Sequence, residues 1–265
     1  MRDCRPPAQA DEGSAKSPGG THLLRAGYCR RIGKAGRFFG GIDLRKLIEA
    51  ELIDIVPLKN GFIYLARETL SSGKQAGVFH RYNQVDDKFY QADVLQYIDF
   101  KYGRDGRNIA SQLGDYATCK TVTLHDGALL ASYPNGTIKI VRNGKLTDVD
   151  ELDYEGAPVC SPAVYGRDVW FAVPDANAVI NYSIDHGRTE LRIGGPKTKA
   201  FCHPIDLKIY NNKLFICNEY SYKIRSISFG NYTVEDFRVF NEEVKSYFRC
   251  GEMEYAVLRS GIYQL

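Results

Sequence analysis

The chain has 265 residues, of which 44% are apolar, so it can form one large globular domain or a domain with a tail. Its 18 tyrosines and 13 phenylalanines, against one tryptophan and two methionines, favour β structure, because strands prefer aromatic and β-branched residues. A formal net charge of +3 is too small to indicate a nucleic-acid partner, and no stretch is long and apolar enough to cross a bilayer.

Residues 1–41 differ in composition from the rest of the chain. They are rich in Arg, Gly, Ala and Pro, and they hold eight Lys or Arg against three Asp or Glu. This composition predicts a disordered basic tail, followed by a folded domain over residues 42–265. The alternative for the tail is an arm that contacts a membrane surface or a nucleic acid. The start lacks the apolar core of a secretory signal, which favours a cytoplasmic protein.

Two segments of the domain depart from an alternating β pattern. Residues 43–52, DLRKLIEAEL, have the apolar spacing of a helix and predict one short helix before the first strand. Residues 100–113, FKYGRDGRNIASQL, contain closely spaced glycines and predict an inserted loop.

Five segments share one layout, in which an apolar alternating run, a two-residue polar turn and a second alternating run follow one another. Alternation over four to six residues is typical of a half-buried strand. The turns are rich in Gly, Asn and Asp, which accept the positive φ that tight hairpins need. The segments are 53–66, 120–133, 161–173, 205–218 and 254–265, with turns at Asn60-Gly61, Asp126-Gly127, Gly166-Arg167, Asn211-Asn212 and Ser260-Gly261.

The spacing of these turns indicates the architecture. Successive turns are 66, 40, 45 and 49 residues apart, and the last three intervals fit a propeller blade of about 40–50 residues. Further strands with turns of their own follow residues 133, 173 and 218, which gives four strands per repeat. The sequence therefore predicts an all-β protein, a β-propeller of four-stranded blades with four to five blades visible.

One repeat, HPIDLKIYNNKLFICNEYSYKIRSI, resembles the NHL-type repeat of six-bladed β-propellers in its Pro-x-Asp start, its turn, its apolar strand and its Asn. The repeat SPAVYGRDVWFAVPDANAVINYS is similar, with Pro162 in the place of Pro204. The resemblance implies six blades, whereas the chain shows four and the first hairpin of a fifth. Either the sequence is a fragment, or the disc is smaller or open, or a partner completes it, since a propeller closes by pairing its first and last strands.

The seven cysteines form no CxxC pair and no zinc-finger spacing, which favours reduced thiols. Four of them precede apolar strands at intervals of 41, 42 and 48 residues, namely Cys119, Cys160, Cys202 and Cys250. In a propeller such positions face the central channel, so they predict a ring of thiols that binds a soft metal or undergoes redox chemistry. The alternative is a small buried residue that each repeat inherited.

The sequence contains no nucleophile elbow, zinc-protease motif, P-loop or dinucleotide fingerprint. Similarity to propeller lactonases and hydrolases implies that carboxylate and amide oxygens at the channel, Asp54 among them, could hold Ca²⁺ or Zn²⁺. The candidate ligand-binding residues at the channel mouth are His203, Asp206, Asn218, Glu252 and Glu254.

The predicted function is a non-catalytic scaffold, without a cofactor, that binds a protein, peptide or small ligand on one face of the disc. The alternative is a metal-dependent, lactonase-like hydrolase with a channel-centred Ca or Zn site. Nucleic-acid binding is disfavoured because residues 42–265 are slightly acidic. The chain nevertheless offers one basic strand face, Lys223 and Arg225, beside Tyr220 and Tyr222.

Overall fold

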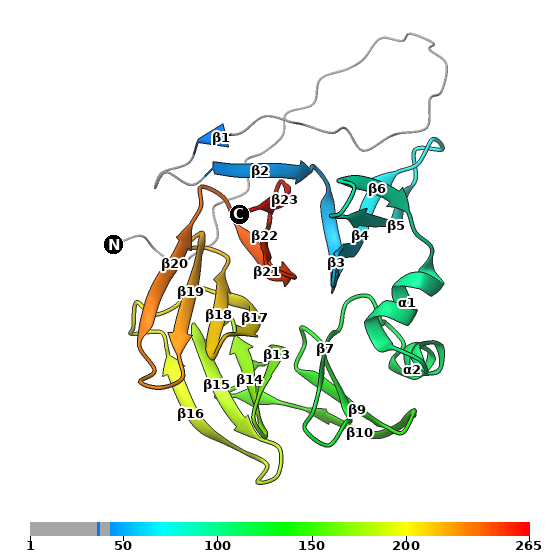
Figure 1. Ribbon diagram of the computed structural model, residues 1–265. Coiled ribbons are helices and arrows are strands. Elements are labelled where there is room, and N and C mark those ends of the chain that lie inside the picture. The colour runs from blue at the N-terminus through cyan, green and yellow to red at the C-terminus, as the bar shows by residue number, and fades with distance from the viewer. Residues whose placement is uncertain (1–35, 38–42) are drawn as a thin grey trace.

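The computed structural model describes residues 36–37 and 43–265. Five antiparallel sheets stand around a central axis, and each contributes four strands to one blade (Figure 1). The predicted all-β propeller of four-stranded blades is therefore confirmed. The blade count is five, not the six that the NHL resemblance implies. The predicted tail, residues 1–41, lies outside the described part of the chain, apart from the short strand β1 (Gly36–Arg37), which pairs with β2.

Each blade is a meander whose first strand lies nearest the axis. A small ribbon of β11 (Asp153–Tyr154) and β12 (Ala157–Pro158) links blades 2 and 3. Blade 1 comprises β3 (Glu51–Leu58), β4 (Gly61–Thr69), β5 (Gln75–Asn83) and β6 (Lys88–Gln91); blade 2 comprises β7 (Lys120–Thr123), β8 (Leu129–Ser132), β9 (Thr137–Arg142) and β10 (Lys145–Glu151); blade 3 comprises β13 (Cys160–Tyr165), β14 (Asp168–Val173), β15 (Ala178–Ser183) and β16 (Arg188–Gly194); blade 4 comprises β17 (Pro204–Tyr210), β18 (Lys213–Asn218), β19 (Lys223–Ser228) and β20 (Val234–Val239); blade 5 comprises β21 (Val244–Cys250), β22 (Met253–Leu258), β23 (Gly261–Gln264) and β2 (Asp43–Ile48).

The second strand of a blade is covered on both faces, so its residues are apolar without alternation. In β14 every residue from Val169 to Val173 is buried. Between blades 5 and 1 an aromatic cluster fills the gap, with the Phe62 ring centroid 5.3 Å from that of Phe248 and 5.4 Å from that of Tyr255. Aromatic burial of this kind holds neighbouring blades at a fixed angle.

The predicted loop at residues 100–113 is wrong, because this segment lies in two short helices. Helix α1 spans Val94–Tyr102 and α2 spans Gly106–Leu113. The Asp93 carboxylate caps α1 by accepting a hydrogen bond from the Gln96 backbone N–H at 2.8 Å. The helices fill the space between blades 1 and 2, where α1 lies against β3 and α2 against β10 (Figure 1). Neither described helix is long and apolar enough to span a bilayer.

The predicted helix at residues 43–52 is also wrong. Residues 43–48 form β2, which pairs with β23 and closes the disc, and β3 begins at Glu51. The pairing of β2 slips between Lys46 and Ile48, so Leu47 and Ile48 are both buried. Because of that slip, the buried residues of β2 have the apolar spacing of a helix turn. The strand conformation of β2 is nevertheless favoured, because the edge of β23 provides its hydrogen bonds.

The fifth predicted hairpin, residues 254–265, is real but does not match the other four. It joins the second and third strands of blade 5, whereas the other hairpins join first and second strands. The first strand of blade 5 is β21, which ends at Cys250. The repeat alignment is therefore displaced by one strand in blade 5, and the disc closes as a complete ring of five blades.

We expect Gly261→Ala to weaken this closure. Gly261 has φ +138°, and an added Cβ would lie 1.9 Å from the Ile48 carbonyl oxygen in β2. Strain and clash together should lower the free energy of unfolding by about 3 kcal/mol or more, measured by urea denaturation with the buried Trp170 as fluorescent probe. Gly230→Ala is the control, since its Cβ would meet open space. Equal stability of the two variants would contradict the closure by β2.

Candidate functional site

A one-residue slip in four innermost strands brings polar side chains into the channel. The slips occur near the starts of β3, β13, β17 and β21. Such bulges redirect side chains and are frequent beside functional sites. Pairing resumes at Asp54 in β3, at Asp206 in β17 and at Ser246 in β21, and all three are buried. Polar groups far apart in the sequence therefore meet at the hub.

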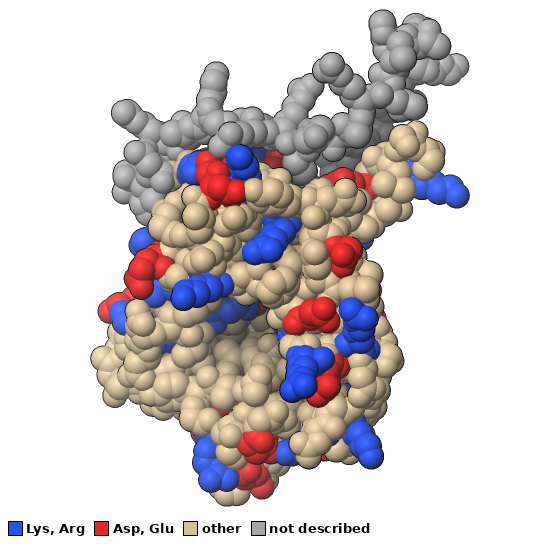
Figure 2. All heavy atoms as spheres, turned by 45° about the vertical axis from the view of Figure 1, so that its right-hand side comes forward, with Lys and Arg blue, Asp and Glu red and all other residues tan. Residues whose placement is uncertain are grey.

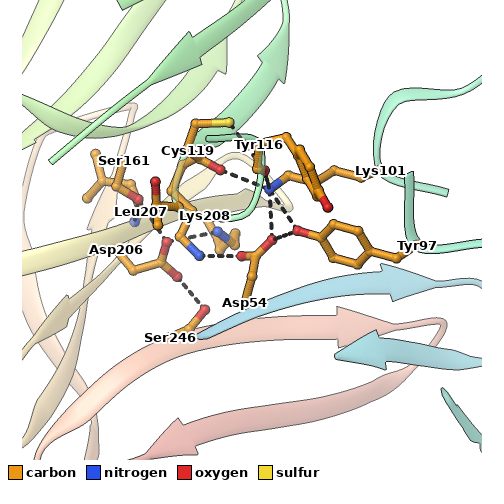
Figure 3. Close-up of polar contacts among 12 residues, drawn as sticks. Asp54, Tyr97, Lys101, Tyr116, Cys119, Ser161, Asp206, Leu207, Lys208 and Ser246 are labelled. Atoms are coloured by element: carbon orange, nitrogen blue, oxygen red, sulfur yellow. Dashed lines mark hydrogen bonds and ion pairs between the residues drawn. The ribbon is translucent and has the colours of Figure 1, made fainter. Parts of the chain in front are cut away.

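The Asp54 carboxylate is the centre of a buried ion-pair network (Figure 3). Lys101 Nζ and the Tyr97 hydroxyl donate to its Oδ2 at 2.8 and 2.5 Å, and Lys120 Nζ donates to its Oδ1 at 2.8 Å. The side chains of Asp54 and Lys101 are 3% and 6% exposed. Both carboxylate oxygens are thus satisfied by charged or hydroxyl donors.

Lys101 also ties the helical insertion to blade 2. Its ammonium group donates to the carbonyl oxygens of Tyr116 at 2.8 Å and Cys119 at 3.0 Å (Figure 3). These two residues precede β7, so one side chain on α1 connects blade 1 with the start of blade 2. Lys120, the first residue of β7, joins the same two blades directly by donating to Asp54 in β3.

The charges of this network reinforce one another. Burial acts to raise the pKa of Asp54, but Lys120 and Lys101 outweigh it and lower that pKa to about 2. Burial acts to lower the pKa of Lys120, but Asp54 and Asp206 outweigh it, so the net shift is upward and the ammonium stays charged. The pairs are therefore ionic across the physiological range.

Asp206 forms a second network on the opposite side of the channel. Its Oδ1 accepts hydrogen bonds from Ser161 Oγ at 2.8 Å and Lys208 Nζ at 2.9 Å, and its Oδ2 accepts one from Ser246 Oγ at 2.6 Å (Figure 3). Burial acts to raise the pKa of Asp206, but Lys208 and Lys120 lower it overall. Together the two aspartate networks form a polar plug across the channel.

Cavities lie on both sides of this plug. On the side where the innermost strands start, which we call the strand-start mouth, are two cavities of about 340 and 520 Å³ that meet at Lys120 and Ile205. On the side where these strands end is a cavity of about 400 Å³, which Lys120 and Lys208 also line. The channel therefore has recesses on both sides of the plug, and plug residues such as Asp54 and Lys120 line both of them.

The rim of the strand-start mouth carries linked charges. Glu219 accepts from a His203 ring nitrogen at 2.7 Å and also pairs with Lys245, whose Nζ lies 2.9 Å from Glu243 Oε2. The Tyr220 ring stacks on His203 at a centroid distance of 4.4 Å. Burial acts to raise the pKa of Glu219, but His203 and Lys245 lower it overall. The rim thus presents fixed positive and negative groups beside an aromatic face.

The backbone at this mouth is also unusual. Ser161 and His203 occupy equivalent positions, each before a proline, and have φ of 49° and 54°. Such values cost energy for residues other than glycine and are frequent at ligand-binding sites. The amide oxygen of Asn177 stabilises the second site by accepting from the His203 backbone N–H at 2.7 Å.

The predicted ligand-binding residues do not form one group. His203 stands at the strand-start mouth and Asp206 in the plug. Asn218 is fully buried, and its Oδ1 accepts from the Cys202 backbone N–H at 3.0 Å, so it supports the loop that carries His203. Glu252 and Glu254 follow β21 at the opposite end of the disc, where Glu254 pairs with Arg249.

The four predicted channel cysteines occupy unlike positions. Cys119 contacts the Tyr102 hydroxyl, Cys160 lines the 340 Å³ cavity, and Cys202 immediately precedes His203. Cys250 lies at the end of β21, not the start, and its Sγ donates to the Gly61 carbonyl at 2.8 Å. Burial raises the pKa of Cys160 to about 12 and that of Cys250 to about 11, so both thiols stay protonated. Across residues 43–265 no group of three or more His, Cys, Asp or Glu is placed to hold a metal ion.

Sequence reasoning missed the lysines that dominate the channel. Lys120 directly follows Cys119, so the repeat alignment placed it near the hub but gave it no role. Lys101 and Tyr97 could not be found in this way, because only the helical insertion carries them to Asp54.

The predicted basic strand face is neutralised. Asp236 pairs with Lys223 at 2.6 Å and with Arg225 at 2.8 Å. On the face drawn in Figure 2, Lys and Arg are interspersed with Asp and Glu and form no large area of one sign. Neither this strand face nor the face drawn in Figure 2 offers the continuous positive surface that favours binding of a phosphate backbone.

No protein family and no curated protein match the sequence. Among solved structures, a Bacteroides thetaiotaomicron protein of unknown function is similar with a TM-score of 0.54 at 10% identity, over 84% of this chain and 71% of that one. The WD40 β-propeller domain of Doa1 is similar with a TM-score of 0.46 at 11% identity, over 83% of this chain and 64% of that one. Saccharomyces cerevisiae Sqt1 is similar with a TM-score of 0.44 at 9% identity, over 81% of this chain and 71% of that one. At 10% identity, the similarity to the Bacteroides thetaiotaomicron protein shows a shared fold and nothing more.

We expect Lys101→Met to destabilise the fold by about 3–5 kcal/mol, because it leaves part of the Asp54 charge and two carbonyl oxygens without their donor. Chemical denaturation of the purified variant would measure this. Lys145→Met, on the exposed strand β10, is the matched control and should change stability by less than about 0.5 kcal/mol. A Lys101 variant as stable as the control would show that the network is dispensable.

We expect acid to remove the stabilisation that Asp54 provides. Its pKa lies at about 2 in the fold against an ordinary value of 3.8, so the stabilisation is complete above about pH 4 and is lost as the pH falls towards 2. The difference corresponds to about 2 kcal/mol. Urea denaturation between pH 2 and 7 should show a correspondingly shallower pH dependence in Asp54→Asn than in the unaltered chain. Parallel profiles would refute this role for Asp54.

Proposed function

We propose that this chain is a non-catalytic propeller scaffold that binds a segment of a protein or peptide at the strand-start mouth. The observation that carries the proposal is the pair of adjoining cavities, which meet at Lys120 and Ile205 and together extend across the mouth. An elongated segment can occupy both cavities, whereas a compact metabolite would fill one.

The lining of the mouth suits a polypeptide. Apolar walls alternate with charged groups of both signs, a combination typical of protein interfaces. Tyr220 and His203 offer a flat aromatic surface at the rim. The rigid blades hold these groups in place, so a ligand would bind without ordering them first. The apolar wall residues are Leu52, Ile53, Ile55, Pro134, Pro158, Pro174, Ile205, Val257 and Leu258.

The channel favours a scaffold over a metal-dependent hydrolase. A catalytic Ca²⁺ or Zn²⁺ needs carboxylate or amide oxygens that are free to bind it. Here lysine ammonium and hydroxyl groups already occupy both oxygens of Asp54 and both oxygens of Asp206. A metal would have to displace charged lysines from these positions, and the repulsion between cations opposes that exchange.

Two finer predictions remain part of the proposal. The Pro204-Ile205-Asp206 pattern supports a relation to NHL-type repeats at the level of single blades, although the disc has five of them. The cytoplasmic location stays a prediction, which rests on the sequence alone.

Selection of peptides from a random library on the immobilised chain tests the proposal. Selected peptides should bind through the strand-start mouth, so Asp175→Lys in the smaller cavity and Arg259→Glu in the larger should each weaken binding by roughly tenfold or more. Both side chains are about 70% exposed, at 70% and 68%, so the fold should tolerate the changes. Arg167→Glu, equally exposed on the β13–β14 turn at the other end of the disc, is the control.

Peptides that respond to the Arg167 variant but to neither mouth variant would overturn the proposed site. The hydrolase alternative has its own test, which combines elemental analysis with a panel of lactones and phosphoesters. Stoichiometric Ca²⁺ or Zn²⁺, with turnover that Asp206→Ala abolishes, would establish an enzyme instead of a scaffold.

A further inference from the structure

The cavity of about 400 Å³ on the strand-end side of the plug plays no part in the proposed function. It lies inside the ring of innermost strands, and β3, β7, β13, β17 and β21 all contribute residues to it. Its volume falls within the range of small-molecule sites, about 300–1,000 Å³. Four charged side chains of the plug lie at its inner end, namely Asp54, Lys101, Lys120 and Lys208.

The charges of the plug do not balance. It contains two carboxylates, Asp54 and Asp206, and three ammonium groups, Lys101, Lys120 and Lys208. Among the described charged residues, only Asp54 and the three lysines line the cavity, and Asp206 lies behind Lys208 as its partner. The inner end of the cavity therefore carries an excess of one positive charge in partly buried surroundings, where an uncompensated charge is costly.

Two of the three ammonium groups have donors to spare. Lys101 uses its protons on Asp54, Tyr97 and two backbone carbonyls. Among the described residues, Lys120 Nζ donates only to Asp54 Oδ1 and Lys208 Nζ only to Asp206 Oδ1. Each ammonium has three N–H groups, so both can bind a further acceptor. Their side chains are 36% and 30% exposed, which makes them reachable from the cavity.

Most of the uncharged residues that line the cavity are apolar. A single negative charge would neutralise the excess, and an apolar body would match the wall, whereas inorganic phosphate would bring more charge than the site lacks and no apolar surface. The apolar lining residues that remain at least partly exposed are Ile55, Pro57, Val122, Val164, Ile209 and Tyr210.

We propose that this cavity binds a small monocarboxylate with an apolar body, whose carboxylate oxygens accept hydrogen bonds from Lys120 and Lys208. The site lies on the other side of the plug from the strand-start mouth, so it is a second binding site and does not depend on the proposed function.

Calorimetric titration of the full chain at fixed salt, with hexanoate and hexanamide, tests the charge requirement without any substitution. The acid should bind tenfold or more tightly than its amide, because hydrogen bonds to charged groups are the stronger ones. Within the series from acetate to hexanoate, affinity should rise about fourfold for each CH₂ group that becomes buried. Inorganic phosphate should bind more weakly than hexanoate.

Lys208→Gln should reduce hexanoate affinity roughly tenfold or more, towards that of the amide. Lys208 does not line the strand-start mouth, so peptide binding there should persist, which separates failure of this site from failure of the scaffold proposal. Lys145→Gln on the outer strand β10 is the matched control and should bind hexanoate as the unaltered chain does.

Three results would overturn the site: equal affinity for the acid and its amide, tighter binding of phosphate than of hexanoate, or unchanged hexanoate binding in the Lys208 variant. Absence of hexanoate binding at millimolar concentration would do the same. If Lys208→Gln does not fold, the comparison of acid, amide and phosphate on the unaltered chain still decides.

Discussion

The buried pairing of Asp54 with Lys101 and Lys120 is the interaction on which the rest of the hub depends. A propeller normally gains its cohesion from blades that pack directly on their neighbours, but here α1 and α2 stand between blades 1 and 2. The Lys101 ammonium spans that gap by binding Asp54 on one side and the backbone before β7 on the other. A buried ion pair adds little to stability compared with apolar packing, yet breaking it is costly, so it acts mainly to fix one arrangement of its partners. In this chain it fixes where the insertion sits in the ring.

The ring also needs its last blade to be completed by a strand from the other end of the domain. β2 comes before blade 1 in the sequence and pairs with β23, so the first and last segments of the domain hold each other. This arrangement covers the outer edge of β23, which would otherwise offer unpaired backbone groups to other chains. The close approach of the Ile48 carbonyl to Gly261 shows how little room the closure leaves. Closure at blade 5 and the ion pair at blade 1 therefore constrain the same ring at two places, one through backbone and one through charge.

The sequence predicts the parts of the fold that are local and fails where distant contacts decide. The hairpin at Asn211-Asn212 can be predicted from the sequence because asparagine accepts positive φ more readily than most residues. Both turn residues adopt such values, 49° and 58°. The strand at residues 43–48 is not recoverable, because its bulge imitates helical spacing and its partner lies more than 200 residues later. The same limit applies to the site. Asp206 is visible in the Pro-x-Asp pattern, but Lys101 meets Asp54 only through an insertion whose position no short-range pattern encodes.

The plug has a consequence for how one molecule could bind two ligands. Lys120 lines the cavities on both sides and is bound to Asp54 between them. A negative group that approaches Lys120 from one side competes with Asp54 for the same ammonium and so alters the charge that the other side presents. Coupling between two sites requires such a shared group with different free energy in the two bound states. Lys208, the other ammonium group of the plug with unused donors, lines only the strand-end cavity, so Lys120 is the ammonium group through which the two sides of the plug can affect one another.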